Sequence, residues 1–378
     1  MKTSKIINKK GAEFLKPKKR KLAKTTKKKI HTHIEKKGKN QKAQKVKLQR
    51  AENNPIIEPN EHYWESKATF NPTAIYENGK VHLVYRAIGD DDISVLGYAS
   101  SRDGINIHER LKYPIYRRII DKNPSDEPVS YSSGGGWCGG CEDPRLTLIE
   151  DKIYLVYTAF DGWGQIRLAL ASIKKEDFLE KKWDWNEAIF LSPPDEIHKN
   201  WVLFPEKING KFAILHSIAP EISIDYVDSF DDFDSEKYIK SYFNGRSAKK
   251  KSWDNLMRGA GPSPIRTSAG WLLLYHAMDT RDPNRYKIGA LILDINDPTK
   301  ILHRSKYPIL EPDEVYENEG FKAGVVYGCG AVVKDNDLFV YYGGADKYAC
   351  VASIPLDKLI EGIKGRKSKM ARLVVKKK

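Results

Sequence analysis

The chain has 378 residues and carries 65 Lys and Arg against 50 Asp and Glu, for a formal net charge of +15. Residues 1–50 hold 18 Lys and 2 Arg against 2 Glu, a net charge of +18, so the remainder carries −3, the difference between +15 and +18. No run approaches the ~20 apolar residues of a membrane span, and the start lacks the apolar segment of a secretion signal. We therefore expect a cytoplasmic protein whose basicity is confined to an N-terminal arm.

This N-terminal arm, residues 1–52, is predicted to be disordered. It has few aromatic residues and its like charges repel, so it cannot bury enough apolar surface to order itself. A Lys-rich segment of this kind can contact nucleic acid or another anionic surface through counterion release. The alternative is a solvated tail without a specific partner. Residues 363–378 form a second, shorter basic segment and are predicted to be a frayed end.

Between these ends, residues 53–362 contain a short unit that recurs five times. Each copy has a polar, Gly or Pro step, followed by an apolar run that ends in aromatic residues. Successive copies are 72, 61, 57 and 67 residues apart, close enough to a fixed period to indicate one repeated supersecondary unit. The copies are FNPTAIYENGKVHLVYRA at Asn71, EDPRLTLIEDKIYLVYTA at Asp143, LFPEKINGKFAILHS at Phe204, GPSPIRTSAGWLLLYHA at Gly261 and GCGAVVKDNDLFVYYGG at Gly328.

Each copy has the pattern of a β-hairpin with further strands. Apolar and polar residues alternate, as in VHLVY at 81–85, and the pairs Asn78-Gly79 and Asn209-Gly210 predict hairpin turns. Another strand candidate follows each run, for instance VLGYASS or KIGALIL. Four short antiparallel strands, repeated five times around an axis, predict an all-β, five-bladed β-propeller over residues 53–362. A pair of unrelated β-sandwiches is the alternative.

Four cysteines are too few for a disulfide framework, which fits a reducing compartment. Cys138 and Cys141 have metal-ligand spacing, but Cys329 and Cys350 form no second pair of that kind, so we predict no metal site. The Gly-rich stretch 132–141 is not followed by the Lys of a phosphate-binding loop. It either lets the backbone approach a ligand or is a flexible connection between blades.

Candidate site residues lie where the repeats differ from one another, because loops at one mouth of a propeller bring side chains of every blade together. Charged residues at the ends of apolar strands are costly to bury unless they are paired or bind a ligand. Carboxylates that bind hydroxyls, next to cations that bind anions, suit a sugar beside a phosphate. The candidates are Asn71, Arg86, Asp143, Arg145, Tyr157, Asp161, Lys199, Glu206, His276, Asp279, Asp346 and Lys347.

Each candidate also has a structural interpretation. Asp143 and Arg145 can be an ion pair in a turn, with Arg145 bracing Asp143, and His276 can be a satisfied core histidine. Arg167 and Lys199 can be solvated, as charges on a strand face usually are.

Over residues 60–355 the order and spacing of several motifs resemble glycoside hydrolase family 130, the mannoside phosphorylases and related mannosidases. The motifs are FNP at Asn71, LVYRA at Arg86, CEDPRLT at Asp143, IRLALAS at Arg167, FPEKINGK after Lys199, WDNLMRGAGPSPI, GWLLLYHAMD at His276, and CGA and YYGGAD ending at Asp346. Relatives often carry a basic residue where this chain has Met257, with Arg258 after it.

The resemblance implies a five-bladed propeller and an inverting mechanism. Asp143 looks like the proton donor, acting through a hydroxyl of the bound mannose. The sugar would be positioned by Asn71, Arg86, Asp279 and Asp346, and inorganic phosphate would be held by Arg167, Lys199 and His276 as a cationic set. No cofactor beyond phosphate as co-substrate is expected, and the oligomeric state stays open, a homo-oligomer included.

General chemistry supports these roles. Inversion needs an acid on the leaving-group side and a nucleophile on the other, and where that other side is cationic, phosphate is the natural attacker. An Asp that stays protonated near neutral pH needs a raised pKa, so we expect Asp143 to be buried near Trp137 or Tyr131.

The predicted activity is therefore phosphorolysis of a β-mannoside or manno-oligosaccharide to α-mannose 1-phosphate and a shorter sugar. The alternatives are a hydrolase using Glu206 or Asp279 as base, and a non-catalytic sugar-binding propeller. The insertions 105–135 and 232–252, which would select the acceptor, carry no readable signature.

Overall fold

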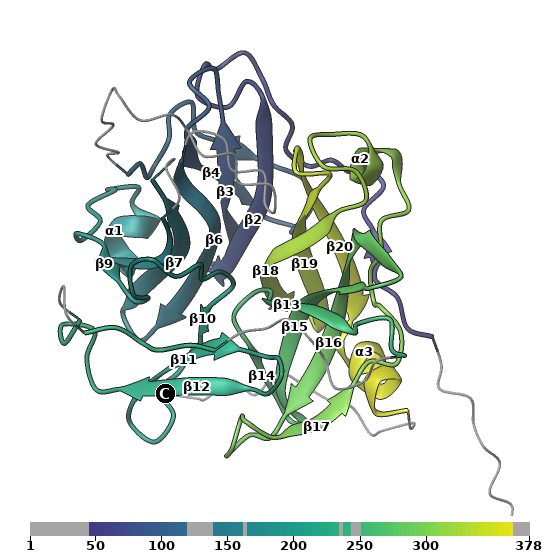
Figure 1. Cartoon of the computed structure of the whole chain (residues 1–378). Helices are drawn as coiled ribbons and strands as arrows, with labels where there is room; N and C mark the ends of the chain where they lie inside the picture. The colour runs from purple at the N-terminus through teal and green to yellow at the C-terminus, as the bar shows by residue number, and fades with distance from the viewer. Residues whose placement is uncertain (1–44, 119–138, 162–164, 234–236, 243–250, 366–378) are drawn as a thin grey trace, which may run out of the picture. The chain divides into compact units, whose positions relative to one another are not determined.

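The computed structural model describes residues 45–118, 139–161, 165–233, 237–242 and 251–365 (Figure 1). Strands dominate these ranges, and the helices within them have 5, 4 and 9 residues, so the predicted all-β class is confirmed. None of these helices is long and apolar enough to cross a membrane. The strands form antiparallel groups, which we number one to five in the order of the repeat copies.

Groups one and two contain the copies at Asn71 and Asp143. Group one consists of β2 (Ala68–Glu77), β3 (Lys80–Ile88), β4 (Ser94–Ser101) and β5 (Glu109–Arg110). Group two consists of β6 (Gly140–Ile149), β7 (Lys152–Phe160), β8 (Ile166–Lys174) and β9 (Ile189–Phe190), with α1 (Lys175–Leu179) after β8. A single parallel bridge between Ser94 and Gly140 joins the two groups.

The other groups follow in chain order. Group three consists of β10 (Val202–Leu203), β11 (Phe212–Ser217) and β12 (Ser223–Val227). Group four consists of β13 (Leu256–Ala260), β14 (Ile265–Thr267), β15 (Gly270–Asp279), β16 (Asp282–Leu293) and β17 (Ile301–Arg304). Group five consists of β18 (Val326–Lys334), β19 (Asp337–Gly344), β20 (Tyr348–Pro355) and β1 (Gln49–Arg50), and α2 (Val315–Asn318) and α3 (Leu356–Lys364) flank it in the chain.

The number of strands per copy departs from the predicted four in two places. Within the described residues group three has three strands, and group four has five because β13 and β14 both pair with β15. Groups one, two and five have the predicted four.

The hydrophobic core is divided into clusters, most of which lie between two groups. Tyr98 of group one packs in the same cluster as Leu155 of group two. Corresponding clusters join groups two and three, three and four, and four and five. A further cluster holds Tyr341 and Val351 of group five together with Leu83 of group one. Every group therefore packs on the groups before and after it, and the last packs on the first.

The N-terminal boundary of this fold lies earlier than predicted. Gln49–Arg50 forms β1, which pairs antiparallel with β20, and Leu48 is buried. Lys47 forms a 2.8 Å ion pair with Glu311. Residues 45–52 thus belong to the folded unit, because group five takes its outer strand, β1, from this part of the chain. The predicted disorder of residues 1–44 lies outside the described residues.

The C-terminal boundary at residue 362 is also too early, by a smaller margin. Helix α3 continues to Lys364, its residue Ile363 is buried, and Gly365 closes it in the left-handed conformation with φ 68°. The rest of the predicted basic end, 366–378, lies outside the described residues.

The first strand of four groups carries a β-bulge at corresponding places. The register shifts between Phe70 and Thr73 in β2, and between Glu142 and Arg145 in β6. Equivalent shifts occur near Arg258 in β13 and near Cys329 in β18. An extra residue re-aims side chains and bends the strand, which is why bulges recur beside active sites. Asn71 and Asp143 occupy the first two bulges, with φ of 48° and 51°.

The described cysteines are buried thiols. Cys141, Cys329 and Cys350 are unoxidised, and burial raises the pKa of the Cys141 and Cys329 thiols to about 12. Cys138 lies outside the described residues, and within them no three His, Cys, Asp or Glu side chains gather as a metal site.

Candidate active site

The two bulge residues of groups one and two meet. Asn71 donates from Nδ2 to Oδ1 of Asp143 at 2.7 Å, and Arg86 donates from Nη1 to the same oxygen at 3.3 Å. All three side chains are buried. Asn71 Oδ1 is buried without a hydrogen-bond partner, so it is an acceptor suited to a sugar hydroxyl. The Asn71 side chain can lie here only because residue 343 is glycine: a Cβ at Gly343 would be 2.0 Å from Oδ1 of Asn71.

Glu142, which the sequence analysis did not single out, links two of the predicted cations. Arg86 donates from Nη2 to Oε1 of Glu142 at 2.8 Å, and Lys199 donates from Nζ to Oε2 at 3.0 Å. The Lys199 side chain retains 15% exposure, whereas Arg86 and Glu142 are closed off. Glu142 directly precedes Asp143, and strand alternation would have sent the two side chains to opposite faces. The bulge between Glu142 and Arg145, which contains Asp143, brings both side chains to Arg86.

The electrostatics of Asp143 differ from the expectation. Burial raises its pKa, but the charges of Lys199, Arg86 and Arg145 and the hydrogen bond from Asn71 outweigh burial and hold the pKa at about 2. The predicted raised pKa is therefore wrong for the protein without substrate, because the cations around the carboxylate stabilise its charged form. The predicted neighbours Trp137 and Tyr131 lie outside the described residues.

Asp346 is the carboxyl group whose pKa is raised. Burial is the main cause, the charge of Asp143 adds to it, and the charges of Lys322, Arg86 and Lys199 act in the opposite direction, which leaves the pKa at about 6. The structure therefore brings together four of the predicted site residues, close enough for their charges to interact: Asp143, Arg86, Lys199 and Asp346. They come from groups one, two and five and from the loop before group three.

Comparison with known proteins identifies the family of this chain. A family model described as beta-1,4-mannooligosaccharide phosphorylase matches residues 26–365. The chain belongs to glycoside hydrolase family 130. It is 39% identical to a 1,2-beta-oligomannan phosphorylase of Thermoanaerobacter sp. (strain X514), over 82% of this chain and 98% of the relative. It is 36% identical to a beta-1,2-mannobiose phosphorylase of the same organism, over 83% and 99% of the two chains.

A solved structure is similar throughout. The Listeria innocua beta-1,2-mannobiose phosphorylase in complex with beta-1,2-mannobiose superimposes with a TM-score of 0.64 at 25% identity, covering 84% of this chain and 99% of that one. The match therefore spans nearly the whole of the Listeria chain.

In this family-130 chain Arg145 hydrogen-bonds to three segments near Asp143. It donates from Nη1 to the main-chain oxygen of Asp143 at 2.7 Å, from Nε to that of Gly261 at 2.9 Å, and from Nη2 to Oδ1 of Asn200 at 2.8 Å. Arg145 is fully buried. The predicted bracing role is thus a main-chain contact: Arg145 holds the bulge that carries Asp143, and contributes its charge without contacting the carboxylate.

Asn200 completes this network. Its Oδ1 also accepts from the hydroxyl of Tyr327, and its Nδ2 donates to the main-chain oxygen of Arg258 at 2.6 Å. A Cβ at Gly259, whose φ is 126°, would lie 2.5 Å from the Asn200 Cβ, so the chain can pass this close only at glycine. We call Arg145, Asn200 and Tyr327 the inner network; it joins groups two, four and five to the loop before group three.

His276 lies against the inner network. Its ring stacks on Tyr327 with 3.9 Å between centroids, and Nε2 lies 2.9 Å from the main-chain oxygen of Gly328. Because a carbonyl only accepts, Nε2 carries the proton and Nδ1, which is buried without a partner, is an acceptor. Burial, with the charge of Arg145, lowers the His276 pKa to about 3. The prediction of a cationic His276 is therefore wrong: the ring is neutral.

The structure does not join every predicted residue to this cluster. Arg167 donates from Nε and Nη2 to the main-chain oxygen of Ser192, and its guanidinium lies 3.8 Å from the centre of the Phe190 ring. Asp279 accepts from Asn255 and Arg281 at the end of β15. None of the contacts among the described residues links Arg167 or Asp279 to Asp143.

The remaining candidates from the sequence lie in local contacts. Tyr157 is buried with its hydroxyl 3.1 Å from that of Tyr116, and the Asp161 carboxylate accepts from the main chain of Gln165 at 3.1 Å. Lys347 lies over the ring of its neighbour Tyr348.

Two cations that act on the site residues, Lys322 and Arg258, were not among the candidates from the sequence. Lys322, half-buried 4.7 Å from the centre of the Tyr286 ring, acts on the pKa of Asp346, and nothing in its sequence context distinguishes it from other lysines. Arg258, which follows Met257, lowers the pKa of His276 through its charge. Met257 itself is buried in the core.

Proposed function

We propose that this protein is an inverting phosphorylase that cleaves β-1,2-linked mannosides with inorganic phosphate, releasing α-mannose 1-phosphate and a shortened sugar. The observation that carries the proposal is one carboxylate, Asp143, surrounded by the charges of Lys199, Arg86 and Arg145, while Glu142 is held between Arg86 and Lys199. The names of the relatives at 39% and 36% identity support both the phosphorolysis and the β-1,2 linkage.

The fold proposed for this enzyme is a five-bladed β-propeller. Support comes from the five strand groups, from core clusters that join each group to the next and the last to the first, and from β1, which completes group five with a strand from the other end of the chain. The first strands β2, β6 and β18 are neighbours of one another, as inner strands around an axis would be (Figure 1).

In the reaction, a phosphate oxygen forms a bond to the anomeric carbon of the mannosyl unit as the glycosidic bond breaks on the opposite face. The leaving oxygen takes up one proton, which Asp143 supplies through a hydroxyl of the bound mannose. Asp143 must hold that proton when both substrates are bound. A phosphate dianion beside Lys199 offsets the charge that most lowers the Asp143 pKa, so phosphate binding itself raises that pKa toward the working range.

Lys199 and His276 are the residues proposed to bind phosphate. Lys199 supplies a positive charge and His276 an unpartnered acceptor, Nδ1, that can receive the hydroxyl proton of a hydrogen phosphate dianion. A neutral His276 can accept this hydrogen bond at Nδ1, whereas an imidazolium, with both ring nitrogens protonated, could not. Arg167 stays a sequence-based candidate for the same role. Inorganic phosphate is the co-substrate, and the mechanism draws on no other cofactor.

Hydrolysis on the same fold is the second candidate, and the contacts of its two candidate bases disfavour it. Glu206 is paired with Arg266, and Asp279 with Arg281. An Arg partner holds a carboxylate in its charged form but also weakens it as a base, and for Asp279 the hydrogen bond from Arg281 lowers the pKa far below its ordinary value.

The deciding experiment incubates the purified full chain with β-1,2-mannobiose, with and without inorganic phosphate, and measures mannose 1-phosphate and free mannose. Mannose 1-phosphate that forms only with phosphate is expected. Free mannose formed at the same rate without phosphate would move the assignment to a hydrolase. The Asp143→Asn variant keeps the shape of the side chain and should lose nearly all turnover while its circular dichroism spectrum stays unchanged; retention of most of the rate would contradict the role of Asp143.

A further inference from the structure

A serine, a histidine and an aspartate form a chain of hydrogen bonds at group three. Oγ of Ser241 lies 2.8 Å from Nδ1 of His216, and Nε2 of the same ring lies 2.9 Å from Oδ2 of Asp225. None of the three was a candidate from the sequence. Within the part of the chain that the structure describes, no contact links them to Asp143, so they call for an explanation of their own.

These contacts determine where the protons lie when the His216 ring is neutral. An ionised Asp225 carboxylate only accepts, so Nε2 carries the ring proton and Nδ1 is an acceptor. The Ser241 hydroxyl then donates to Nδ1 at 2.8 Å, because the main-chain oxygen of His216 is a more distant acceptor at 3.4 Å. A hydroxyl bound to an imidazole that a carboxylate orients has the arrangement of a nucleophile with its general base.

The fold orients the His216 ring. Strand β11 pairs with β12, and the register shifts between Leu215 and Ser217, so His216 lies in a β-bulge. A bulge re-aims a side chain that strand alternation would direct elsewhere. The His216 side chain is only 6% exposed, and its ring centre lies 5.4 Å from that of the buried Trp201. The imidazole is thus held within reach of Ser241, as a general base must be.

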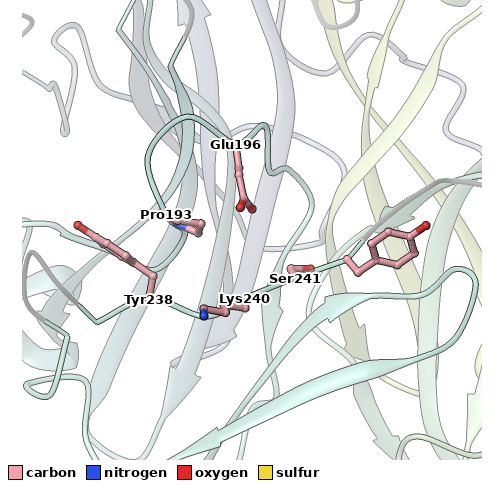
Figure 2. Close-up of a pocket in the computed structure, with 6 residues that line it drawn as sticks. Pro193, Glu196, Tyr238, Lys240 and Ser241 are labelled. Atoms are coloured by element: carbon pink, nitrogen blue, oxygen red, sulfur yellow. The ribbon is translucent and has the colours of Figure 1, made fainter.

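Ser241 lines a cavity of about 320 Å³, so a small ligand can reach it. The lining residues are Pro193, Glu196, Tyr238, Lys240, Ser241 and Tyr242. In Figure 2, Lys240 and Ser241 lie on one segment, and the Glu196 carboxylate points toward that segment from the loop above. The main chain of Ile239 donates to that of Leu191 at 2.9 Å, which ties the segment to the core.

The lining suits a short carboxylic ester. Pro193 and the rings of Tyr238 and Tyr242 offer apolar surface to an acyl group, and the volume is that of a pocket for a small ligand. Lys240 brings a positive charge, which stabilises the oxyanion that forms when a serine attacks a carbonyl carbon. A phosphate ester fits less well, because the Glu196 carboxylate faces the same space.

We propose that Ser241, His216 and Asp225 form a second catalytic site, which hydrolyses short-chain carboxylic esters independently of the phosphorolysis proposed above. Oγ of Ser241 forms a bond to the ester carbonyl carbon as its proton passes to Nδ1 of His216. The bond from that carbon to the alkoxy oxygen then breaks, and the alcohol leaves with the proton. Water attacks the acyl-serine in the same way, His216 returns the proton to Oγ, and a carboxylic acid is released. Asp225 is a positioning residue that keeps the ring proton on Nε2.

The first test treats the full chain with a fluorophosphonate probe, which reacts with activated serines, and locates the adduct by peptide mass spectrometry. The adduct is expected on Ser241 and should be absent from Ser241→Ala. Ser223→Ala removes another half-buried hydroxyl of the same group and is the matched control, which should be labelled like the wild type. No adduct on Ser241, under conditions that label a known serine esterase completely, would overturn the site.

The second test measures turnover of p-nitrophenyl acetate without mannoside or phosphate. Ser241→Ala should lower kcat/KM by about 100-fold or more. Asp225→Asn should lower kcat by about 100-fold and leave KM within about twofold, because Asp225 orients His216 and does not contact the ester. Both positions are partly exposed, and the melting temperature of each variant checks that its fold is intact. Hydrolysis at the wild-type rate by Ser241→Ala would refute the site, and an unchanged kcat in Asp225→Asn would refute the role of Asp225.

Discussion

Replacement of Asn200 by alanine should destabilise the protein strongly, because its side chain makes three hydrogen bonds at the centre of the inner network. Asn200 Oδ1 accepts from both Arg145 and Tyr327, and Nδ2 donates to the main chain of Arg258. A buried polar group left unpaired costs about 1–3 kcal/mol, and more when it is charged. Three hydrogen-bonding partners of Asn200 would be affected. With some relaxation of the structure, the free energy of unfolding should fall by about 3–5 kcal/mol.

The assay is urea unfolding followed by tryptophan fluorescence, with a double-mutant cycle. Tyr327→Phe alone should cost about 1 kcal/mol, since Asn200 still accepts from Arg145. In the Tyr327→Phe background no hydroxyl is left orphaned, so Asn200→Ala should cost about 1–2 kcal/mol less than in the wild type. Asn296→Ala, at an exposed asparagine, is the control and should stay within about 0.5 kcal/mol of the wild type. Additive costs within about 0.5 kcal/mol would refute the shared-acceptor argument.

Three further predictions concern the charges of the site and the boundary of the fold. Lys199→Met should raise the phosphate KM by about 10- to 100-fold, as expected for loss of one charged hydrogen bond, and the mannoside KM far less; equal changes measured in initial-rate kinetics would remove Lys199 from the phosphate site. The folded pKa of Asp346 is raised from 3.8 to about 6, so the folded state binds more protons between these values and stability falls as pH rises through 6. Unfolding free energies at pH 4 and pH 7 should show this loss, about 3 kcal/mol, in the wild type but not in Asp346→Asn, and identical pH dependence would contradict the assignment. Deletion of residues 1–44 should leave the melting temperature and activity unchanged, whereas deletion of 1–52 also removes β1 and should lower the melting temperature clearly; equal stability of the two truncations would show that β1 contributes nothing.

The repeat pattern and the family motifs were sufficient to predict that polar side chains of different copies meet. The bulge positions Asn71 and Asp143, both followed by Pro, stand at corresponding places in two copies, and the structure brings their side chains to 2.7 Å from each other although they are 72 residues apart. Repetition predicts such a meeting because equivalent positions of radially arranged units face the same point.

The contacts across the groups had no comparable signal. Glu142 would be assigned to the opposite face from Asp143 by strand alternation, and only the bulge reverses that. Asn200, Tyr327 and Lys322 come from segments far from Asp143 in the chain, and each is an ordinary polar residue in its local context. Such residues are identified only when the segments are packed together.

Strand class, the five repeated units and the chemical types gathered at Asp143 follow from local periodicity and composition, which depend only on neighbours in the chain. The protonation states do not, because they depend on distances between groups that folding sets. Three cations around Asp143 lower the pKa that burial alone would raise, burial leaves His276 neutral, and Asp346 is the carboxyl group that stays protonated more readily. The same holds for β1, which lies near the start of the chain but belongs to group five. In this strand Gln49 pairs with Ser353, about 300 residues away, and no local pattern indicates that pairing.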